Sequence, residues 1–229
     1  MRITAELDIF GLGRAALAKT RSLFGERACF SSARRLRADF TWAGPDEASH
    51  GLAEERLLGP GDLGRARAVG ANALLCELEG GLAGDPATSG LRLLVRVPFS
   101  AGEDVGERAA RLARLAGLLD RVPALDGIWP EPTGEAQGLD TLVFFAACRQ
   151  ACGRGHLVVN LESFGLKLGQ LCLSFGADEI SGSIVGQRAL RLGERAASHD
   201  LTRDEAVTLL RTAGLSPCER LPAGLGQGV

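Results

Sequence analysis

Charged side chains recur at every second position in several segments of this sequence, with the period of a β-strand. Glu77 and Glu79 share one face of segment 73–81, and Arg92 and Arg96 share one face of segment 91–99. A sheet covered by helices on both faces needs strands that are almost wholly apolar. The charged faces therefore favour a barrel that is apolar outside and has a polar lumen.

Carboxylates could gather at the ends of these strands, on the face where barrel enzymes keep their sites. A ring of this kind could bind a divalent cation or an amine, or do acid/base chemistry. Arginines on the same faces could instead neutralise it, which would leave a polar lumen without chemistry. Both interpretations stay open. The candidate carboxylates are Glu77, Glu79, Glu131, Glu162, Asp178 and Glu179, with Arg37 and Arg96 as ligand-binding candidates and Arg35 as a further neutralising charge.

Other catalytic patterns are missing from the sequence. Ser163 and Ser181 have no histidine at a recognisable spacing, and no nucleophile elbow is present. There is no Walker sequence, and "FGLGRAA" (10–16) opens a predicted helix without a strand before it. These observations argue against a serine hydrolase and against a nucleotide-binding fold.

Cys148 and Cys152 lie four residues apart on a predicted helix. We interpret them as small residues on its buried face. The alternative is a Cys-Cys-His metal site completed by His156, which extends the same row.

Six predicted strands alternate with helices, which indicates parallel β-α-β units with right-handed crossovers. We predict a compact or incomplete TIM-type barrel of about six such units, forming one domain over 1–229. A helix occupies part of 1–30, and a further helix and tail occupy 200–229, where Thr202 and Glu205 form a capping box. The predicted strands are 34–42, 73–81, 91–99, 125–132, 156–164 and 177–185, and the predicted helices are 5–26, 61–70, 103–122, 138–152, 165–175 and 201–214.

Composition restricts the partners and the location. The formal net charge of −2 over 229 residues gives no basic field for nucleic acid. No apolar run approaches the roughly 20 residues that span a bilayer, and the first residues lack the pattern of a signal peptide. The six cysteines are scattered in apolar contexts, as reduced thiols are. We expect a cytoplasmic protein.

Two stretches near the end of the chain, "FGLKLGQLCLSFGADEISGSIV" and "LTRDEAVTLLRTAGLSPCER", resemble the C-terminal part of the menaquinone-pathway radical SAM enzymes. That family includes aminofutalosine synthase and dehypoxanthine futalosine cyclase, with FO synthase as a relative. "RARAVGANALLCELEGGL" is similar to its second strand. The resemblance implies that Gly80 and Gly81 correspond to a turn that meets the amino group of SAM, so both join the candidate ligand-binding residues.

Two departures from the family decide what the resemblance implies. Its members hold a [4Fe–4S] cluster through Cys-x3-Cys-x2-Cys after the first strand, but the equivalent loop here, "WAGPDEASHG", has no cysteine. We expect no cluster, and at Gly80–Gly81 we favour a tight turn over retained SAM binding. The family chain is also longer, and the missing length falls between Gly81 and Leu91. Six strands would leave an opening that either closes more tightly or is covered, for example by a second chain.

The resemblance implies a cluster-less protein linked to menaquinone biosynthesis by the futalosine route. It would act as the partner of a cluster-bearing homologue, or bind a related small polar ligand, without radical chemistry of its own; self-association is a further expectation. The alternative is an enzyme that uses the carboxylate ring for metal-assisted or acid/base chemistry on a small polar substrate.

Overall fold

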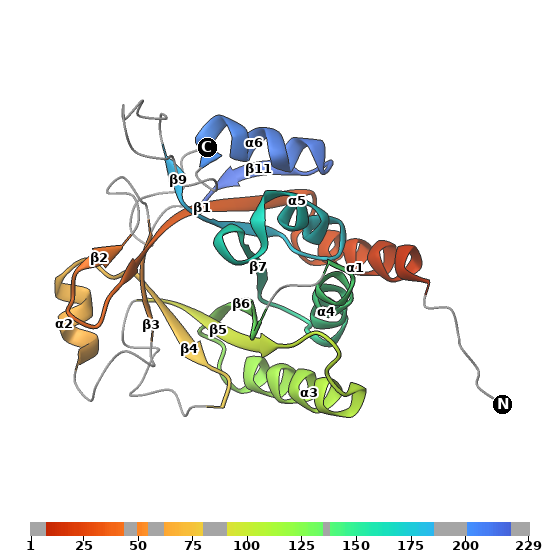
Figure 1. The fold of residues 1–229 in the computed structure, drawn as a ribbon, viewed down its shortest axis with the longest axis horizontal. Coiled ribbons are helices and arrows are strands. Elements are labelled where there is room, and N and C mark those ends of the chain that lie inside the picture. Colours follow the sequence, from red (N-terminus) through yellow and green to blue (C-terminus); the bar gives the residue numbers. More distant parts are fainter. Residues whose placement is uncertain are drawn as a thin grey trace.

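The computed structural model describes residues 8–43, 50–54, 62–79, 91–134, 138–185 and 201–220. In these residues seven parallel strands pair in chain order, and the last pairs with the first, so the sheet closes into a barrel (Figure 1). The predicted TIM-type barrel is confirmed. Its strands are β1 (Arg27–Leu36), β3 (His50–Glu54), β4 (Ala73–Glu77), β5 (Arg92–Phe99), β6 (Leu125–Pro132), β7 (His156–Asn160) and β8 (Glu179–Gly182).

The described barrel has one strand more than the six predicted. Residues 50–54, expected to belong to a loop, form β3 between β1 and β4. The chain turns sharply after β1, where Arg37 N donates to Thr41 O, and β2 (Trp42–Ala43) folds back antiparallel on β1. β1 itself begins at Arg27, seven residues before the predicted start. The additional strand closes the opening that six strands would have left.

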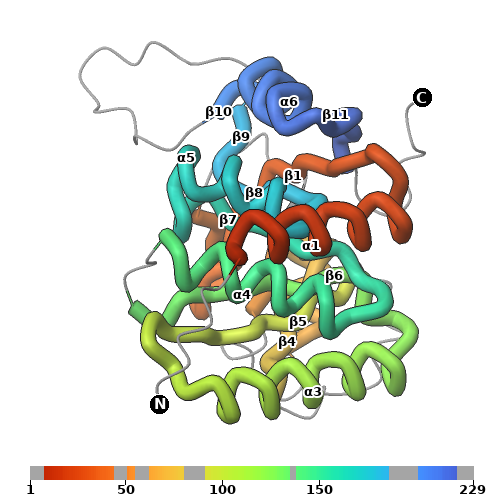
Figure 2. Tube along the Cα trace, turned by 90° about the vertical axis from the view of Figure 1, so that its right-hand side faces the viewer, coloured from red at the N-terminus to blue at the C-terminus, as the bar shows by residue number. Residues whose placement is uncertain are grey.

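Six helices lie outside the barrel in the described residues, and most follow the predicted ranges closely. Figure 2 shows α1, α4 and α3 next to one another across one side of the barrel. The hydroxyl of Thr20 in α1 donates to Gly176 O (2.9 Å), and Phe24 stacks on His156, which starts β7. The end of α1 thus covers the N-terminal ends of β7 and β8. The helices are α1 (Ile9–Phe24), α2 (Asp62–Ala68), α3 (Val105–Arg121), α4 (Gly138–Ala151), α5 (Leu161–Ser174) and α6 (Arg203–Thr212).

The strands face two separate apolar regions. Leu93, Val95 and Val97 of β5 belong to the large core between the barrel and its helices. Leu94 of the same strand faces the lumen, whose central apolar layer is made of Leu52, Ala73, Leu75, Leu94, Trp129 and Val158. The alternation read from the sequence is confirmed. It places Arg92 and Arg96 on the lumen face too, about 13 Å apart along the strand.

The C-terminal part of the described chain packs against the start of β1. The predicted capping box is present, since Thr202 accepts from Glu205 N and the Glu205 carboxylate accepts from Thr202 N. After α6, β11 (Ser216–Glu219), which no pattern in the sequence predicted, pairs in parallel with the first residues of β1. β9 (Ile184–Val185) and β10 (Leu201–Thr202) form a short separate pair. Among the helices of these residues, none has the length and apolarity to cross a membrane.

Candidate functional site

At the C-terminal ends of the strands, the lumen closes with a charged layer centred on Arg96 of β5. Arg96 is 2% exposed. Its Nη2 lies 2.6 Å from Glu54 Oε2 on β3, and its Nε lies 3.0 Å from Glu77 Oε1 on β4. Its Nη1 pairs with Glu131 on β6. Neighbouring parallel strands therefore bring three carboxylates to one guanidinium.

Arg35 of β1 continues this layer around the lumen. Its Nη1 lies 3.3 Å from Glu54 Oε1, and its Nε lies 3.5 Å from Glu162 Oε2. Glu162 is held in place because Asn160, the last residue of β7, caps α5 by accepting from Glu162 N. We call Arg35, Glu54, Glu77, Arg96, Glu131 and Glu162 the mouth ring.

The mouth ring has two positive and four negative charges, hence a net charge of −2. Its buried members are Glu54 and Arg96, whereas the side chains of Glu77 and Glu162 are 31% and 41% exposed. The excess carboxylate charge thus lies on the side reached by water, where it attracts a cationic group.

Trp129 of β6 forms the apolar floor under the mouth ring. It is 2% exposed, and the Arg35 guanidinium lies 5.9 Å from its ring centroid. In the part of the chain that the structure describes, its buried indole N–H has no hydrogen-bond partner. A buried unpaired donor costs free energy, which a ligand that supplies an acceptor would recover.

The structure brings four of the predicted candidates together, namely Glu77, Arg96, Glu131 and Glu162. Arg37 lies instead exposed in the turn after β1, and Glu79 pairs with Arg114 of α3 at 3.2 Å. Gly80 and Gly81 lie outside the described residues. The predicted neutralisation of the carboxylates by arginine is present for Arg35 and Arg96, but Arg37 takes no part in the described contacts of the ring.

The predicted position of Asp178 and Glu179 at this mouth is wrong. Glu179 is the first residue of β8 and pairs in register with Cys29 on β1, so both carboxylates lie at the N-terminal end of the barrel. The resemblance identified the turn and the strand, but it did not show that the two carboxylates come at the start of β8 and therefore at the N-terminal end of the barrel.

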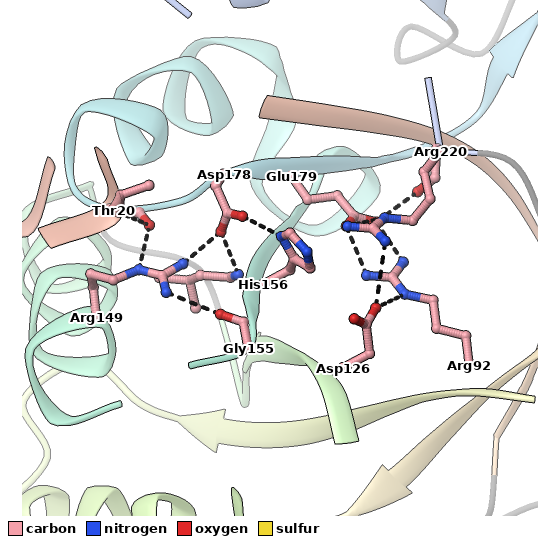
Figure 3. Close-up of polar contacts among 12 residues, drawn as sticks. Thr20, Arg92, Asp126, Arg149, Gly155, His156, Asp178, Glu179 and Arg220 are labelled. Carbon is pink, nitrogen blue, oxygen red and sulfur yellow. Dashed lines mark hydrogen bonds and ion pairs between the residues drawn. The ribbon is translucent and has the colours of Figure 1, made fainter. Parts of the chain in front are cut away.

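At this N-terminal end, Glu179 belongs to a network of four charges, which Figure 3 shows on its right. Arg92 Nη1 and Nη2 contact its two carboxylate oxygens at 2.6 and 2.7 Å, and Arg220 Nε lies 2.8 Å from Oε2. Asp126 pairs with Arg92 Nε at 2.5 Å and with Arg220 at 3.6 Å. We call Arg92, Asp126, Glu179 and Arg220 the base network.

Electrostatics keep the base network charged although Glu179 is fully buried. Burial alone would raise the pKa of Glu179, but the charges of Arg92 and Arg220 outweigh it and hold the pKa far below its usual value. For Arg92, burial would lower the pKa, but the negative charges of Glu179 and Asp126 have the larger effect and raise it above its usual value. The ion pairs of the base network therefore close the N-terminal end of the lumen.

Asp178 joins α4, β7 and β8 in a second buried contact, on the left of Figure 3. It accepts from Arg149 Nη2 (2.5 Å) and Leu157 N (2.7 Å), and its other oxygen contacts His156 Nδ1. Arg149, itself 0% exposed, also donates to Gly155 O and Gly176 O. Every partner is a group of the fold, so this contact is structural.

Cys148 in α4 and Cys152, which directly follows this helix, are fully buried in the outer core, which confirms the interpretation of them as packed, buried residues. Burial raises the pKa of Cys152 to about 11 and that of Cys148 well above its usual value. His156 does not extend their row, because it starts β7 and faces Asp178. Across the described ranges, no three His, Cys, Asp or Glu side chains are arranged to hold a metal ion.

No protein-family model matches the sequence, and no curated protein matches it. Solved structures do match the fold. Methylornithine synthase (PylB) has a TM-score of 0.64 at 13% identity, over 92% of this chain and 89% of that one. HydG, a maturase of the [FeFe]-hydrogenase, has a TM-score of 0.61 at 10% identity, over 92% and 68%. HydG from Carboxydothermus hydrogenoformans has a TM-score of 0.60 at 11% identity, over 90% and 71%. At these identities the likeness shows the fold alone, a TIM-type (β/α) barrel.

The cysteines of this chain do not fit an iron–sulfur cluster at the mouth ring. All six lie in described segments. Cys76, Cys148, Cys152 and Cys172 are 0% exposed in the outer core. Cys29 and Cys218 lie near the base network, on β1 and β11. A cluster at the mouth ring would thus find no thiolate ligand from these residues.

Proposed function

We propose that this chain is a radical-SAM-like barrel protein without a cluster of its own, linked to menaquinone biosynthesis by the futalosine route. It acts as the partner subunit of a cluster-bearing homologue or binds a related small polar ligand, and it does no radical chemistry itself. The observation that carries the proposal is the mouth ring over Trp129, at the end of the barrel where enzymes of this architecture bind their ligands.

The two ends of the lumen differ in a way that supports binding at the mouth ring. The base network pairs two arginines with two carboxylates, and Glu179 is completely buried. The mouth ring has two surplus carboxylates, with Glu77 and Glu162 partly exposed. Below them lies the indole N–H of Trp129, which has no hydrogen-bond partner among the described residues. A small ligand with a cationic group and a hydrogen-bond acceptor would complement both features.

The pathway assignment rests on the resemblance of the two C-terminal stretches. In the structure these stretches form α5, β8, α6 and β11, the order of helix, strand and helix that the resemblance implies. The radical-SAM-like fold supports the same assignment at a coarser level.

The test is the menaquinone content of the host after deletion of this gene, measured by mass spectrometry of extracted quinones. We expect a loss of menaquinone that the wild-type gene restores. A double variant, Glu77→Gln with Glu162→Gln, removes the two surplus charges and should fail to restore it. Glu79→Gln is the matched control, because Glu79 is exposed and pairs outside the ring. An unchanged menaquinone content in the deletion strain would refute the link to the pathway.

The alternative, acid/base or metal-assisted chemistry by the isolated chain, is less favoured by the geometry. Each carboxylate of the mouth ring already pairs with Arg35 or Arg96, and these guanidinium groups compete with a metal ion or a substrate for the carboxylate oxygens. Turnover of a small polar substrate by the purified chain alone would favour this alternative instead.

A further inference from the structure

Two cysteines face each other at the N-terminal end of the barrel. Cys29 of β1 and Cys218 of β11 are register partners in a parallel strand pair, so their side chains lie on the same face. Neighbouring strands are about 4.7–4.9 Å apart. This spacing falls within the range of about 4.4–6.8 Å between the Cα atoms of a disulfide.

The other four cysteines differ from this pair in burial. Cys29 and Cys218 are both partly exposed, whereas Cys76, Cys148, Cys152 and Cys172 are 0% exposed. An oxidant in solution can therefore reach the facing pair without unfolding the outer core. We propose that Cys29 and Cys218 form a reversible disulfide that fastens β11 to the barrel.

The surroundings of the two sulfurs set the order of reaction. Arg27 Nη2 lies 3.3 Å from Cys218 Sγ, so a cationic group stands beside this sulfur. Burial, with the nearby Glu179 carboxylate, raises the pKa of Cys29 to about 12 against the opposing charge of Arg220. Cys218 is thus the attacking thiol, and Cys29 is the resolving thiol.

The oxidant in this proposal is a small-molecule disulfide such as oxidised glutathione. The Cys218 thiolate attacks one of its sulfurs, and the other half leaves as a thiolate that takes up the Cys218 proton. Cys29, after losing its proton, attacks the Cys218 sulfur of the mixed disulfide and releases the second glutathione as a thiol. The protein loses two protons and two electrons, and the small disulfide takes them up to give two thiols.

This bond would act on the base network, because Arg220 directly follows β11. Arg220 N donates to Phe30 O on β1, and its guanidinium pairs with Glu179 and Asp126 across the end of the lumen. A covalent link between residues 29 and 218 would hold Arg220 in its contacts with Glu179 and Asp126. The inference concerns the end of the barrel opposite the mouth ring and does not depend on the proposed function.

The experiment treats the folded protein with oxidised glutathione, alkylates the remaining thiols, and maps the peptides by mass spectrometry. With the alkylation carried out after unfolding in denaturant, we expect the peptides of Cys29 and Cys218 to be linked and the other four cysteines to be alkylated. The melting temperature should rise by roughly 5–10 °C and return after reduction. The closing step should be faster at higher pH, because Cys29 must lose its proton.

Two variants separate the proposal from general oxidation. Cys218→Ser should lose both the link and the rise in melting temperature, whereas Cys152→Ala should keep both. The peptide map of the oxidised wild-type protein tests the Cys29–Cys218 disulfide even where a variant fails to fold. Two alkylated thiols at 29 and 218, a glutathione that stays on Cys218, or a link to another cysteine would overturn the proposal.

Discussion

Replacing Glu179 by glutamine tests whether the base network is structural. The side chain is 0% exposed and pairs with Arg92 at two oxygens and with Arg220 at one. The amide would keep the shape of the carboxylate but remove its charge. Arg92, with a side chain only 11% exposed, would retain Asp126 as its sole described carboxylate partner.

The expected loss follows from burial and the number of partners. Removing one member of a buried ion pair costs about 3–5 kcal/mol, because the remaining charge stays buried without compensation. Asp126 still neutralises part of the charge, so we expect about 3 kcal/mol. For a chain of this size that corresponds to a fall in melting temperature of roughly 6–12 °C. The matched control is Glu162→Gln, since Glu162 is 41% exposed and its carboxylate has one charged partner in the described part of the chain, at 3.5 Å; we expect a loss of less than about 1 kcal/mol.

The assay is denaturant unfolding of both variants and the wild type over a range of pH. The pKa of Glu179 is depressed in the folded state, so its contribution is complete above the unfolded value of about 4.3 and is lost as the pH falls towards the folded value. The gap between wild type and Glu179→Gln should therefore be constant near neutrality and shrink below about pH 4. Equal losses for the two variants, or a gap independent of acid, would refute the distinction between the two ends of the lumen.

Two further substitutions test the local structure. Thr202→Ala removes the capping box of α6 and should destabilise the protein by about 1 kcal/mol in denaturant unfolding, with no loss for Thr208→Ala if the cap is the cause. Gly176→Ala places a Cβ 2.8 Å from Arg149 Cβ at a φ of +102° and should cost at least about 2 kcal/mol. Gly64→Ala, inside α2 with open space around it, should instead be neutral or stabilise by up to about 1 kcal/mol in the same assay.

The mouth ring could be predicted in part because residue alternation carries information on which face a side chain takes. Glu77 and Arg96 pair in register on β4 and β5, and both were assigned to the lumen from their two-residue period. Glu54 was missed because β3 has only five residues and follows segment 44–49, which has no strand pattern. Its signal was weak, because Leu52 and Glu54 are the only two positions that share this face in the segment 51–54.

The base network was missed for a different reason. The height of a residue along the barrel axis depends on the register between strands far apart in the sequence. Glu179 is set opposite Cys29 and Val158 by pairings that no local pattern records. Arg220 reaches the same point from the end of the chain, through the parallel pairing of β11 with β1. The local period of a strand shows whether a side chain faces the lumen or the outer core. Only the pairing of the strands in the folded sheet shows at which end of the barrel that side chain lies.

Native mass spectrometry of the protein purified gently from its own host tests the central claim most directly. We predict that the chain is found in a stoichiometric complex with a larger, iron-containing homologue, with the iron remaining on that homologue when the complex is dissociated, or that it carries a small polar molecule. A bare chain with neither would contradict the claim, and so would iron and sulfide bound to this chain itself.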